Sequence, residues 1–313
     1  MHSFADLGAA DGYVDTSHTA GAKVEVRRMR IEITGDAVAY RAAAKSFVSR
    51  DFLRHTVIAT AIANHVDGQR AADGMSRFLS VHAADGAVVG VAMRAGGREV
   101  YLGRLPAESL RPAAEAFAAA APGNSGVEGL VADAEAFAEH WCALRGVGLR
   151  ENVRTRLFRL DELRVPRGVA GAPRRAAARD VALCVAWSEA MHREIGLAQP
   201  HPDPDMIRKR VAAGRWWLWE NGGRPVSLAA HQIPVGGWTR IGPVYTPPAE
   251  RGHGYASALT AQVSRILRRN GFDVCLFADL ANPTSNRIYR AIGYQPVDDF
   301  VNYVFEERPS VSR

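Results

Sequence analysis

The feature that most constrains this chain is the segment Arg251-Gly252-His253-Gly254-Tyr255-Ala256. It lies between a predicted strand ending at Val244-Tyr245-Thr246 and a predicted helix over residues 256–270. Pro247 and Pro248 end the strand because proline has no backbone N–H to donate. The two glycines allow positive φ and leave N–H groups pointing outward at the start of the helix, where a phosphate or pyrophosphate is stabilised. A plain tight turn is the alternative interpretation.

A second motif follows about thirty residues later, after an apolar predicted strand that begins at Cys275. Asn282-Pro283 is typical of a helix start, and Gly293 is typical of the residue that follows a helix. Asn286 and Tyr289 lie on the short helix between these two points.

The order of a strand, a glycine loop, a helix, a strand and a short helix bearing Asn and Tyr resembles the GNAT acetyltransferase superfamily. The resemblance covers roughly residues 240–295. Arg251 to Ala256 is similar to the family's Arg/Gln-x-x-Gly-x-Gly/Ala pyrophosphate loop, and Asn282, Asn286 and Tyr289 are similar to its second signature. The fold class this implies is α/β (α+β), a mixed, mostly antiparallel sheet flanked by helices.

The resemblance also implies acetyl-CoA as co-substrate. Backbone groups of the strand ending at Val244 to Thr246 would pair with the pantetheine arm as an added strand. The glycine loop would hold the diphosphate, and Asn282 and Asn286 would orient the arm or stabilise the splayed backbone; a helix cap is the alternative for Asn282. The predicted coenzyme-binding residues are Val244, Tyr245, Thr246, Arg251, Gly252, His253, Gly254, Tyr255, Ala256, Ser257, Asn282 and Asn286.

Tyr289 is the predicted catalytic residue, since the family's Tyr at this position is commonly the acid that protonates the departing thiolate. A phenol has an ordinary pKa of about 10 and so is protonated at neutral pH; simple aromatic packing is the alternative. An acceptor amine with a pKa of about 10.4 must lose a proton before it attacks. Five candidates for the base remain open: Glu194, His192, Glu220, His231 and Glu250.

The two halves of the chain have a similar predicted order of helices, strands and hairpin turns. This pattern predicts two tandem GNAT-like domains, with a flexible arm over residues 1–25, a first domain over 26–164, a linker over 165–175 and a coenzyme-binding domain over 176–313. The last strand is predicted over Asn302 to Phe305. At the position of the glycine loop, the first half has Gly103-Arg104-Leu105-Pro106. This segment lacks the glycine pair that would leave backbone N–H groups pointing outward. The first half is therefore predicted to be a degenerate copy that walls the acceptor cleft or forms the domain interface.

Composition limits the remaining possibilities. The net charge is +6, but the basic residues are scattered, so no nucleic-acid partner is predicted. The three cysteines are isolated, which argues against disulfides and a zinc site and favours a reducing cytoplasm without a metal. No segment has the apolar length of a membrane span, so no membrane partner is expected.

The leading functional prediction is an N-acetyltransferase that moves an acetyl group from acetyl-CoA to a primary amine, of a small molecule or a protein lysine, by direct attack in a ternary complex. The alternative is a non-catalytic acyl-CoA-binding regulatory or sensor module.

Overall fold

The structure is a computed structural model that describes residues 29–67, 74–195 and 203–307. The arm predicted over residues 1–25 lies outside the described residues. The first half contains β1 (Arg30–Thr34), α1 (Ala37–Val48), α2 (Thr56–Val66), β2 (Arg77–His82), β3 (Val88–Arg94), β4 (Val100–Leu102), a 3₁₀ turn (Ala107–Ser109), α3 (Leu110–Ala120), β5 (Gly126–Leu130), α4 (Val131–Arg145) and β6 (Gly148–Leu160).

The second half contains β7 (Ala172–Arg175), a 3₁₀ turn (Ala178–Asp180), α5 (Val181–Glu194), α6 (Pro204–Ala212), β8 (Trp216–Asn221), β9 (Arg224–His231), β10 (Trp238–Tyr245), a 3₁₀ turn (Pro248–Glu250), α7 (Tyr255–Arg269), β11 (Asp273–Asp279), α8 (Pro283–Ala291) and β12 (Tyr294–Glu306). The order of helices and strands in residues 30–160 therefore recurs in residues 172–306. That they are copies of one domain stays a prediction. One boundary needs correction, because β7 occupies the last four residues of the predicted linker.

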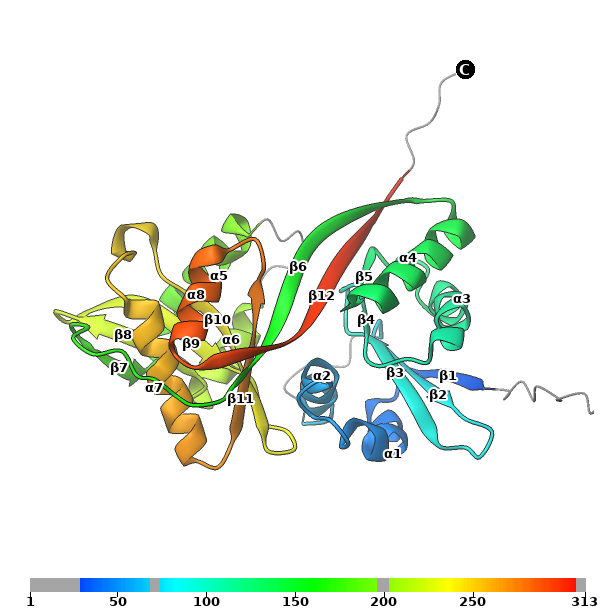
Figure 1. The fold of residues 1–313 in the computed structure, drawn as a ribbon, viewed down its shortest axis with the longest axis horizontal. Coiled ribbons are helices and arrows are strands. Elements are labelled where there is room, and N and C mark those ends of the chain that lie inside the picture. Colours follow the sequence, from blue (N-terminus) through cyan, green and yellow to red (C-terminus); the bar gives the residue numbers. More distant parts are fainter. Residues whose placement is uncertain (1–28, 68–73, 196–202, 308–313) are drawn as a thin grey trace, which may run out of the picture.

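All described strands form one sheet in the order β1-β2-β3-β4-β5-β12-β6-β11-β10-β9-β8-β7 (Figure 1). Its strand pairs are antiparallel apart from β4/β5 and β10/β11, which confirms the mixed, mostly antiparallel sheet. The halves exchange strands at the centre: β12 of the second half lies between β5 and β6 of the first, and β6 pairs with β11. The two halves thereby share one continuous hydrogen-bonded sheet.

The exchanged strand β12 is longer than its sequence suggests. The last strand runs over Tyr294–Glu306, which includes but greatly exceeds the predicted Asn302 to Phe305. Charged pairs between the strands support the pairing: Arg156 donates to both carboxylate oxygens of Asp299 at 2.5 and 2.7 Å. Polar residues in this strand face partners on β6, so they belong to the sheet and not to a loop.

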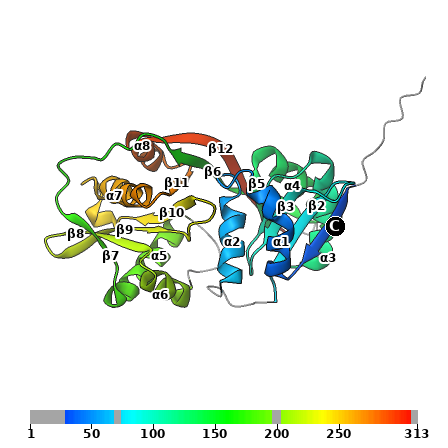
Figure 2. The same cartoon turned by 90° about the horizontal axis from the view of Figure 1, so that it is seen from below.

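Helices cover both faces of the sheet, and in Figure 2 α7 and α8 lie on one side of the second half while α5 and α6 lie on the other. The core under α7 and α8 includes Leu259, Val263 and Leu276, all almost fully buried. The amphipathic spacing of α7 places these apolar side chains on one side of the helix, where burial stabilises its packing on the sheet. In the first half, α3 and α4 cover one core, and α1 and α2 cover another that also includes Cys275 of β11.

Candidate functional site

The glycine loop has the backbone geometry that its sequence predicts. Gly252 and Gly254 have φ of 84° and 79°, and Gly254 is the N-cap of α7. The first hydrogen bond of α7 runs from the Ala258 N–H to the Gly254 carbonyl at 3.0 Å. Within the described part of the chain, the N–H groups of residues 252–257 find no acceptor. These free donors at the positive end of a helix dipole form a site for an anion.

Strands β10 and β11 separate immediately before this loop. Their parallel pairing covers Trp238 to Ile241 against Asp273 to Leu276 and then stops. Between Ile241 and Val244, β10 has a bulge that includes the cis peptide Gly242-Pro243. The strand ends beyond this point diverge and leave backbone edges available to an extended ligand.

A cavity of about 720 Å³ lies along the separated strands and reaches the glycine loop. We call it the loop cavity. A cavity of this size is typical of small-molecule and cofactor sites. Eleven of the thirteen predicted site residues line it: Val244, Tyr245, Thr246, Arg251, Gly252, Gly254, Tyr255, Ala256, Ser257, Asn282 and Tyr289. His253 and Asn286 are the two that do not line it.

Arg251 is tied to the wall of the loop cavity by contacts that the sequence did not reveal. Its Nε donates to the Thr246 carbonyl at 2.9 Å, and its Nη2 donates to Oε2 of Glu194 at 2.5 Å. The other oxygen of Glu194 accepts from the Tyr245 hydroxyl at 2.8 Å. Burial alone would raise the pKa of Glu194, but the hydrogen bonds from Arg251 and Tyr245 outweigh it and hold the pKa below its usual value.

The side chains of two predicted coenzyme-binding residues, His253 and Tyr255, contact each other beside the glycine loop. The exposed His253 ring stacks on the Tyr255 ring, with centroids 5.3 Å apart. The Tyr255 hydroxyl accepts from Asn221 at 2.8 Å, and its side chain is buried in the core. The backbone N–H groups of both residues belong to the row of free donors at the start of α7.

The two asparagines of the second motif serve the backbone around the separated strands. Oδ1 of Asn282 accepts from the Ser285 N–H at 3.1 Å, which is the helix-cap geometry considered as its alternative. Nδ2 of Asn286 donates to the carbonyls of Asp279 and Asn282 at 2.7 and 2.8 Å. Asn286 thus fastens the end of β11 to α8 beside the loop cavity.

Tyr289 lies on α8, lines the loop cavity and is 8 % exposed. Burial raises the pKa of its phenol to about 12, so it stays protonated at neutral pH. The ring also packs against Phe158 and Tyr294, with centroids 6.4 and 6.1 Å away. The arrangement provides a fixed hydroxyl donor near the point where β10 and β11 part.

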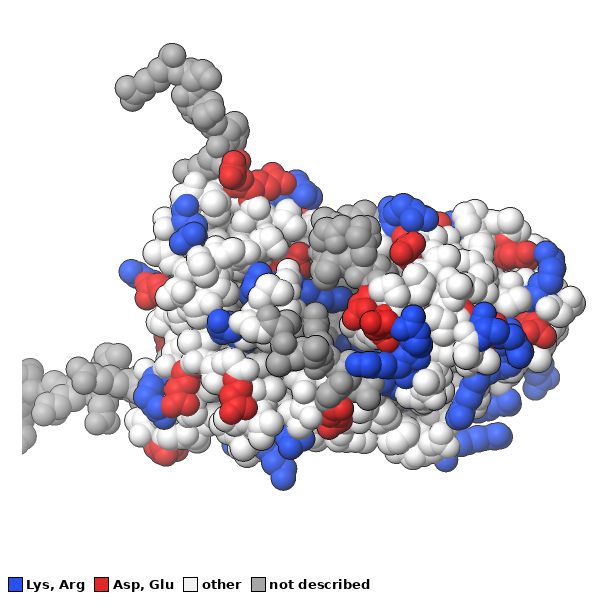
Figure 3. All heavy atoms as spheres, turned by 180° about the vertical axis from the view of Figure 1, so that it is seen from behind, with Lys and Arg blue, Asp and Glu red and all other residues white. Residues whose placement is uncertain are grey.

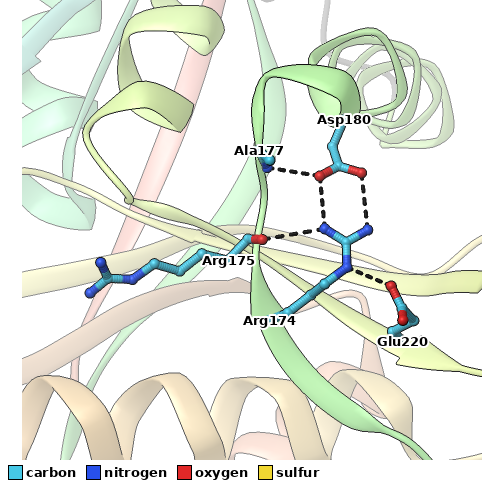
Figure 4. Close-up of polar contacts among 5 residues, drawn as sticks. All are labelled: Arg174, Arg175, Ala177, Asp180 and Glu220. Atoms are coloured by element: carbon cyan, nitrogen blue, oxygen red, sulfur yellow. Dashed lines mark hydrogen bonds and ion pairs between the residues drawn. The ribbon is translucent and has the colours of Figure 1, made fainter. Parts of the chain in front are cut away.

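The candidate bases separate into those near a cavity and those away from it. Glu220 and His231 line neither of the two cavities described here. Glu220 accepts from Nε of Arg174 at 2.5 Å, while the same guanidinium holds both oxygens of Asp180 (Figure 4). Burial lowers the pKa of His231 to about 4, which makes its imidazole a weak base.

The three other candidate bases line a cavity. Glu194 and Glu250 line the loop cavity, but Glu194 is occupied by Arg251 and Tyr245. His192 lines a second cavity, of about 480 Å³, on the α5 and α6 side of β10.

This second cavity, which we call the seam cavity, is walled by both halves of the chain. The first half contributes residues of α2, β3, β4 and β5, and the second half contributes α5, α6 and β10. The seam cavity and the loop cavity share five lining residues, where they meet: Met191, Ile241, Gly242, Pro243 and Phe277. The seam cavity could not be predicted from the sequence, because its walls come from segments that lie far apart in the chain.

The polar side chains of the seam cavity that were not identified from the sequence include Tyr101, Glu128 and Arg240. Tyr101 and Glu128 are register partners on the parallel strands β4 and β5. Burial raises the pKa of the Glu128 carboxyl to about 7, and the charge of Glu99 adds to this while Arg98 and Arg240 oppose it. The alternation of Val127 into the core and Glu128 onto the other face was the only sequence signal for this position.

The corresponding position in the first half has a different local structure. Its 3₁₀ turn and α3 begin without a glycine pair, and Leu110 at the start of α3 is buried. Beside β4, a Cβ added at Gly129 would lie 2.9 Å from Cβ of Leu102. The strands that would have to part in a coenzyme-binding copy are thus packed closely here.

Other types of site receive no support from the part of the chain that the structure describes. Among those residues, no group of three or more His, Cys, Asp or Glu could hold a metal ion, and the three cysteines are free. None of the described helices has the length and apolar character needed to cross a bilayer. On the face in Figure 3, Lys and Arg gather at the end formed by the second half, with acidic side chains interspersed over the first.

Comparison with known proteins supports the assignment of the fold. A protein-family profile described as FR47-like protein matches residues 221–303. An uncharacterized protein of Bacillus subtilis (strain 168), YkzC, is 37% identical over 86 residues, which covers 23% of this chain and 61% of that protein. This chain thus spans less than two thirds of that relative's length.

Two solved structures resemble nearly the whole chain. A GNAT acetyltransferase from Colwellia psychrerythraea has a TM-score of 0.56 and 10% identity, over 89% of this chain and 100% of that one. A GCN5-related N-acetyltransferase from Sphaerobacter thermophilus has a TM-score of 0.55 and 18% identity, over 91% of this chain and 98% of that one. Both likenesses concern the fold, a mixed sheet flanked by helices. The chain therefore has the fold of these acetyltransferases, and its residues 221–303 match the FR47-like profile.

Proposed function

We propose that this protein is an N-acetyltransferase that transfers an acetyl group from acetyl-CoA to a primary amine in a ternary complex. The observation that carries the proposal is the row of free N–H groups over residues 252–257, which opens into a cavity that follows β10 to Tyr289. A diphosphate fits the N–H row, and an extended pantetheine arm fits the free edge of β10.

The acceptor amine would approach from the seam cavity, because the two cavities meet at Ile241 to Pro243 and Phe277. The neutral amine attacks the acetyl carbonyl carbon, a C–N bond forms, and the C–S bond breaks to release the CoA thiolate. The proton that the nitrogen loses is taken up by this thiolate, so the products are the amide and the CoA thiol. Direct attack by the deprotonated amine also requires that both substrates be held in line, which is the contribution of the two adjoining cavities.

The proposed role of Tyr289 is to donate a hydrogen bond to the sulfur as negative charge develops there. Full proton transfer from a phenol with a pKa of about 12 to a thiolate with an ordinary pKa of about 8.5 would be uphill by roughly 5 kcal/mol. A hydrogen bond to a charged group still contributes about 1.5–3 kcal/mol. Stabilisation of the leaving group therefore needs the hydroxyl but not its ionisation.

The test combines calorimetric titration of the full chain with acetyl-CoA and a thiol-release assay over a panel of primary amines. We expect micromolar or tighter binding and release of CoA that depends on an amine. Binding without any amine-dependent release would favour the regulatory or sensor module instead. No binding of acetyl-CoA would contradict both functions.

A further inference from the structure

Two oppositely charged side chains face the seam cavity without an ion-pair partner among the residues that the structure describes. Glu128 lies on β5 of the first half, and Arg240 lies on β10 of the second. Among the described residues, neither makes an ion pair or a side-chain hydrogen bond, and Nη1 of Arg240 is buried with no acceptor. The guanidinium carbon of Arg240 lies 6.0 Å from the centre of the Phe277 ring, at the junction of the two cavities.

A third unpartnered group lies in the same cavity. The Tyr101 side chain is 5 % exposed, and its hydroxyl has no hydrogen-bond partner in the described part of the chain. Tyr101 stands directly beside Glu128 in the sheet register, so the hydroxyl and the carboxyl belong to one wall. Natural proteins pair nearly all buried polar groups, so an unpaired hydroxyl in the wall of a cavity is available to a ligand group or to an ordered water.

The pKa shifts of Glu128 and Arg240 also favour a charged ligand in the seam cavity. Burial lowers the pKa of Arg240 and raises that of Glu128, which means that both charged forms lack the solvation they have in water. The charge of Arg240 lowers the pKa of Glu128, and the charge of Glu128 raises that of Arg240, although the two side chains do not form a salt bridge. A ligand that brings a negative group to Arg240 and a positive group to Glu128 would offset the free-energy cost of burying each charge.

We propose that the seam cavity binds a small zwitterionic acceptor of the amino-acid class, with its carboxylate on Arg240 and its ammonium group on Glu128. This inference rests on the proposed function and specifies its acceptor. The cavity volume of about 480 Å³ suits a small molecule. A lysine within a protein carries the ammonium group but no adjoining anion, so it would leave Arg240 unpaired.

The first half of the chain thereby acquires a role in specificity. It provides Glu128 and Tyr101, while the second half provides Arg240 and the coenzyme loop. The acceptor site is complete only because the exchanged strands β6 and β12 hold the halves in one sheet.

The experiment compares each of the twenty L-amino acids with its carboxamide, which keeps the amine and removes the negative charge. CoA release is measured with the full chain and acetyl-CoA. We expect at least one amino acid to be a substrate and its carboxamide to have a KM about tenfold or more higher, since a charged hydrogen bond contributes about 1.5–3 kcal/mol. Equal use of acid and carboxamide would overturn the inference.

Variants identify the residues responsible. Arg240→Gln should abolish the preference for the acid and leave the Kd of CoA unchanged, and Arg240→Lys should retain part of the preference because it keeps the charge. Glu128→Gln should raise the KM of acid and carboxamide alike. The matched control is Arg111→Gln, which removes an exposed arginine paired with Glu115 on α3. Persistence of the preference in Arg240→Gln would contradict the proposed contact.

Failure of this inference can be distinguished from failure of the proposed function. Binding of the amino acids is also measured calorimetrically to wild type and Arg240→Gln, with and without CoA. Amino-acid binding that is lost in Arg240→Gln supports the seam site even if CoA does not bind. Absence of amino-acid binding under both conditions overturns the seam site even if CoA binds and other amines are acetylated.

Discussion

Glu194 and Arg251 form an ion pair on the wall of the loop cavity, with Oε2 of the carboxylate 2.5 Å from Nη2 of the guanidinium. Arg251 belongs to the loop that is proposed to hold the diphosphate, so a carboxylate already engages the cation that a phosphate would use. The carboxylate also repels a phosphate placed nearby.

The first prediction concerns this pair. Glu194→Gln should tighten the binding of CoA several-fold, because Arg251 becomes available and a negative charge is removed; surface ion-pair effects of about 0.2–1 kcal/mol set the scale. Calorimetric Kd values at low and high salt measure the change, and Glu115→Gln on α3 serves as the control. An unchanged or weaker affinity would show that Arg251 takes no part in binding.

The second prediction separates two effects of replacing a glycine of the loop: the change in CoA binding and the backbone strain of a side chain at positive φ. Gly252 and Gly271 have φ of 84° and 81°, and an added Cβ would meet nothing within 4 Å at either position. Alanine at either position should therefore cost a similar free energy of unfolding, about 1 kcal/mol. Only Gly252→Ala should also weaken CoA binding, by about tenfold, since it places a methyl group beside the anion site. Equal CoA affinity in the two variants would argue against a diphosphate at this loop.

The third prediction tests the hydroxyl of Tyr289. Tyr289→Phe should lower kcat by about 10- to 100-fold, the effect of one hydrogen bond to a developing charge, and leave the Kd of CoA nearly unchanged. Tyr303→Phe is the matched control, because the Tyr303 hydroxyl donates to Glu135 at 3.2 Å and lines neither cavity. An unchanged kcat in Tyr289→Phe would show that Tyr289 packs in the core and takes no part in the reaction.

The fourth prediction uses the raised pKa of Glu128. The folded pKa of about 7 exceeds the ordinary value of 4.5, so this group favours the folded state below pH 4.5 and that contribution is lost as pH rises through 7. The charged groups that act on it are Arg98, Glu99 and Arg240. Relative to Glu128→Gln, wild type should lose up to about 3 kcal/mol of stability between pH 4.5 and 8. Denaturant unfolding at several pH values measures the difference, and parallel curves would contradict the assigned burial.

The local chemistry of the second half could be predicted from the sequence, but its pairing with the first half could not. The glycines, prolines and cap residues between Pro247 and Asn282 determine their own backbone geometry, and most of the predicted site residues indeed line one cavity. Strand exchange depends on contacts distant in the chain. Polar residues such as Gln295 and Asp299 gave the start of β12 the pattern of a loop, although Asp299 is paired with Arg156.

The seam cavity escaped prediction for the same reason. Glu128 and Arg240 are more than a hundred positions apart in the sequence and come together only because the two halves share a sheet. The sequence gives no sign that Arg240 lacks a carboxylate partner, since pairing is a property of the folded chain. What remains predictable is the alternation along β5 that places Val127 and Glu128 on opposite faces of the sheet.

The most direct test of the account is a crystal structure of the full chain with bound CoA. The account predicts diphosphate oxygens within hydrogen-bond distance of the N–H groups of residues 252–257, with the pantetheine arm along β10 and its sulfur beside Tyr289. Density for CoA elsewhere on the molecule, or an N–H row left without the diphosphate, would contradict it.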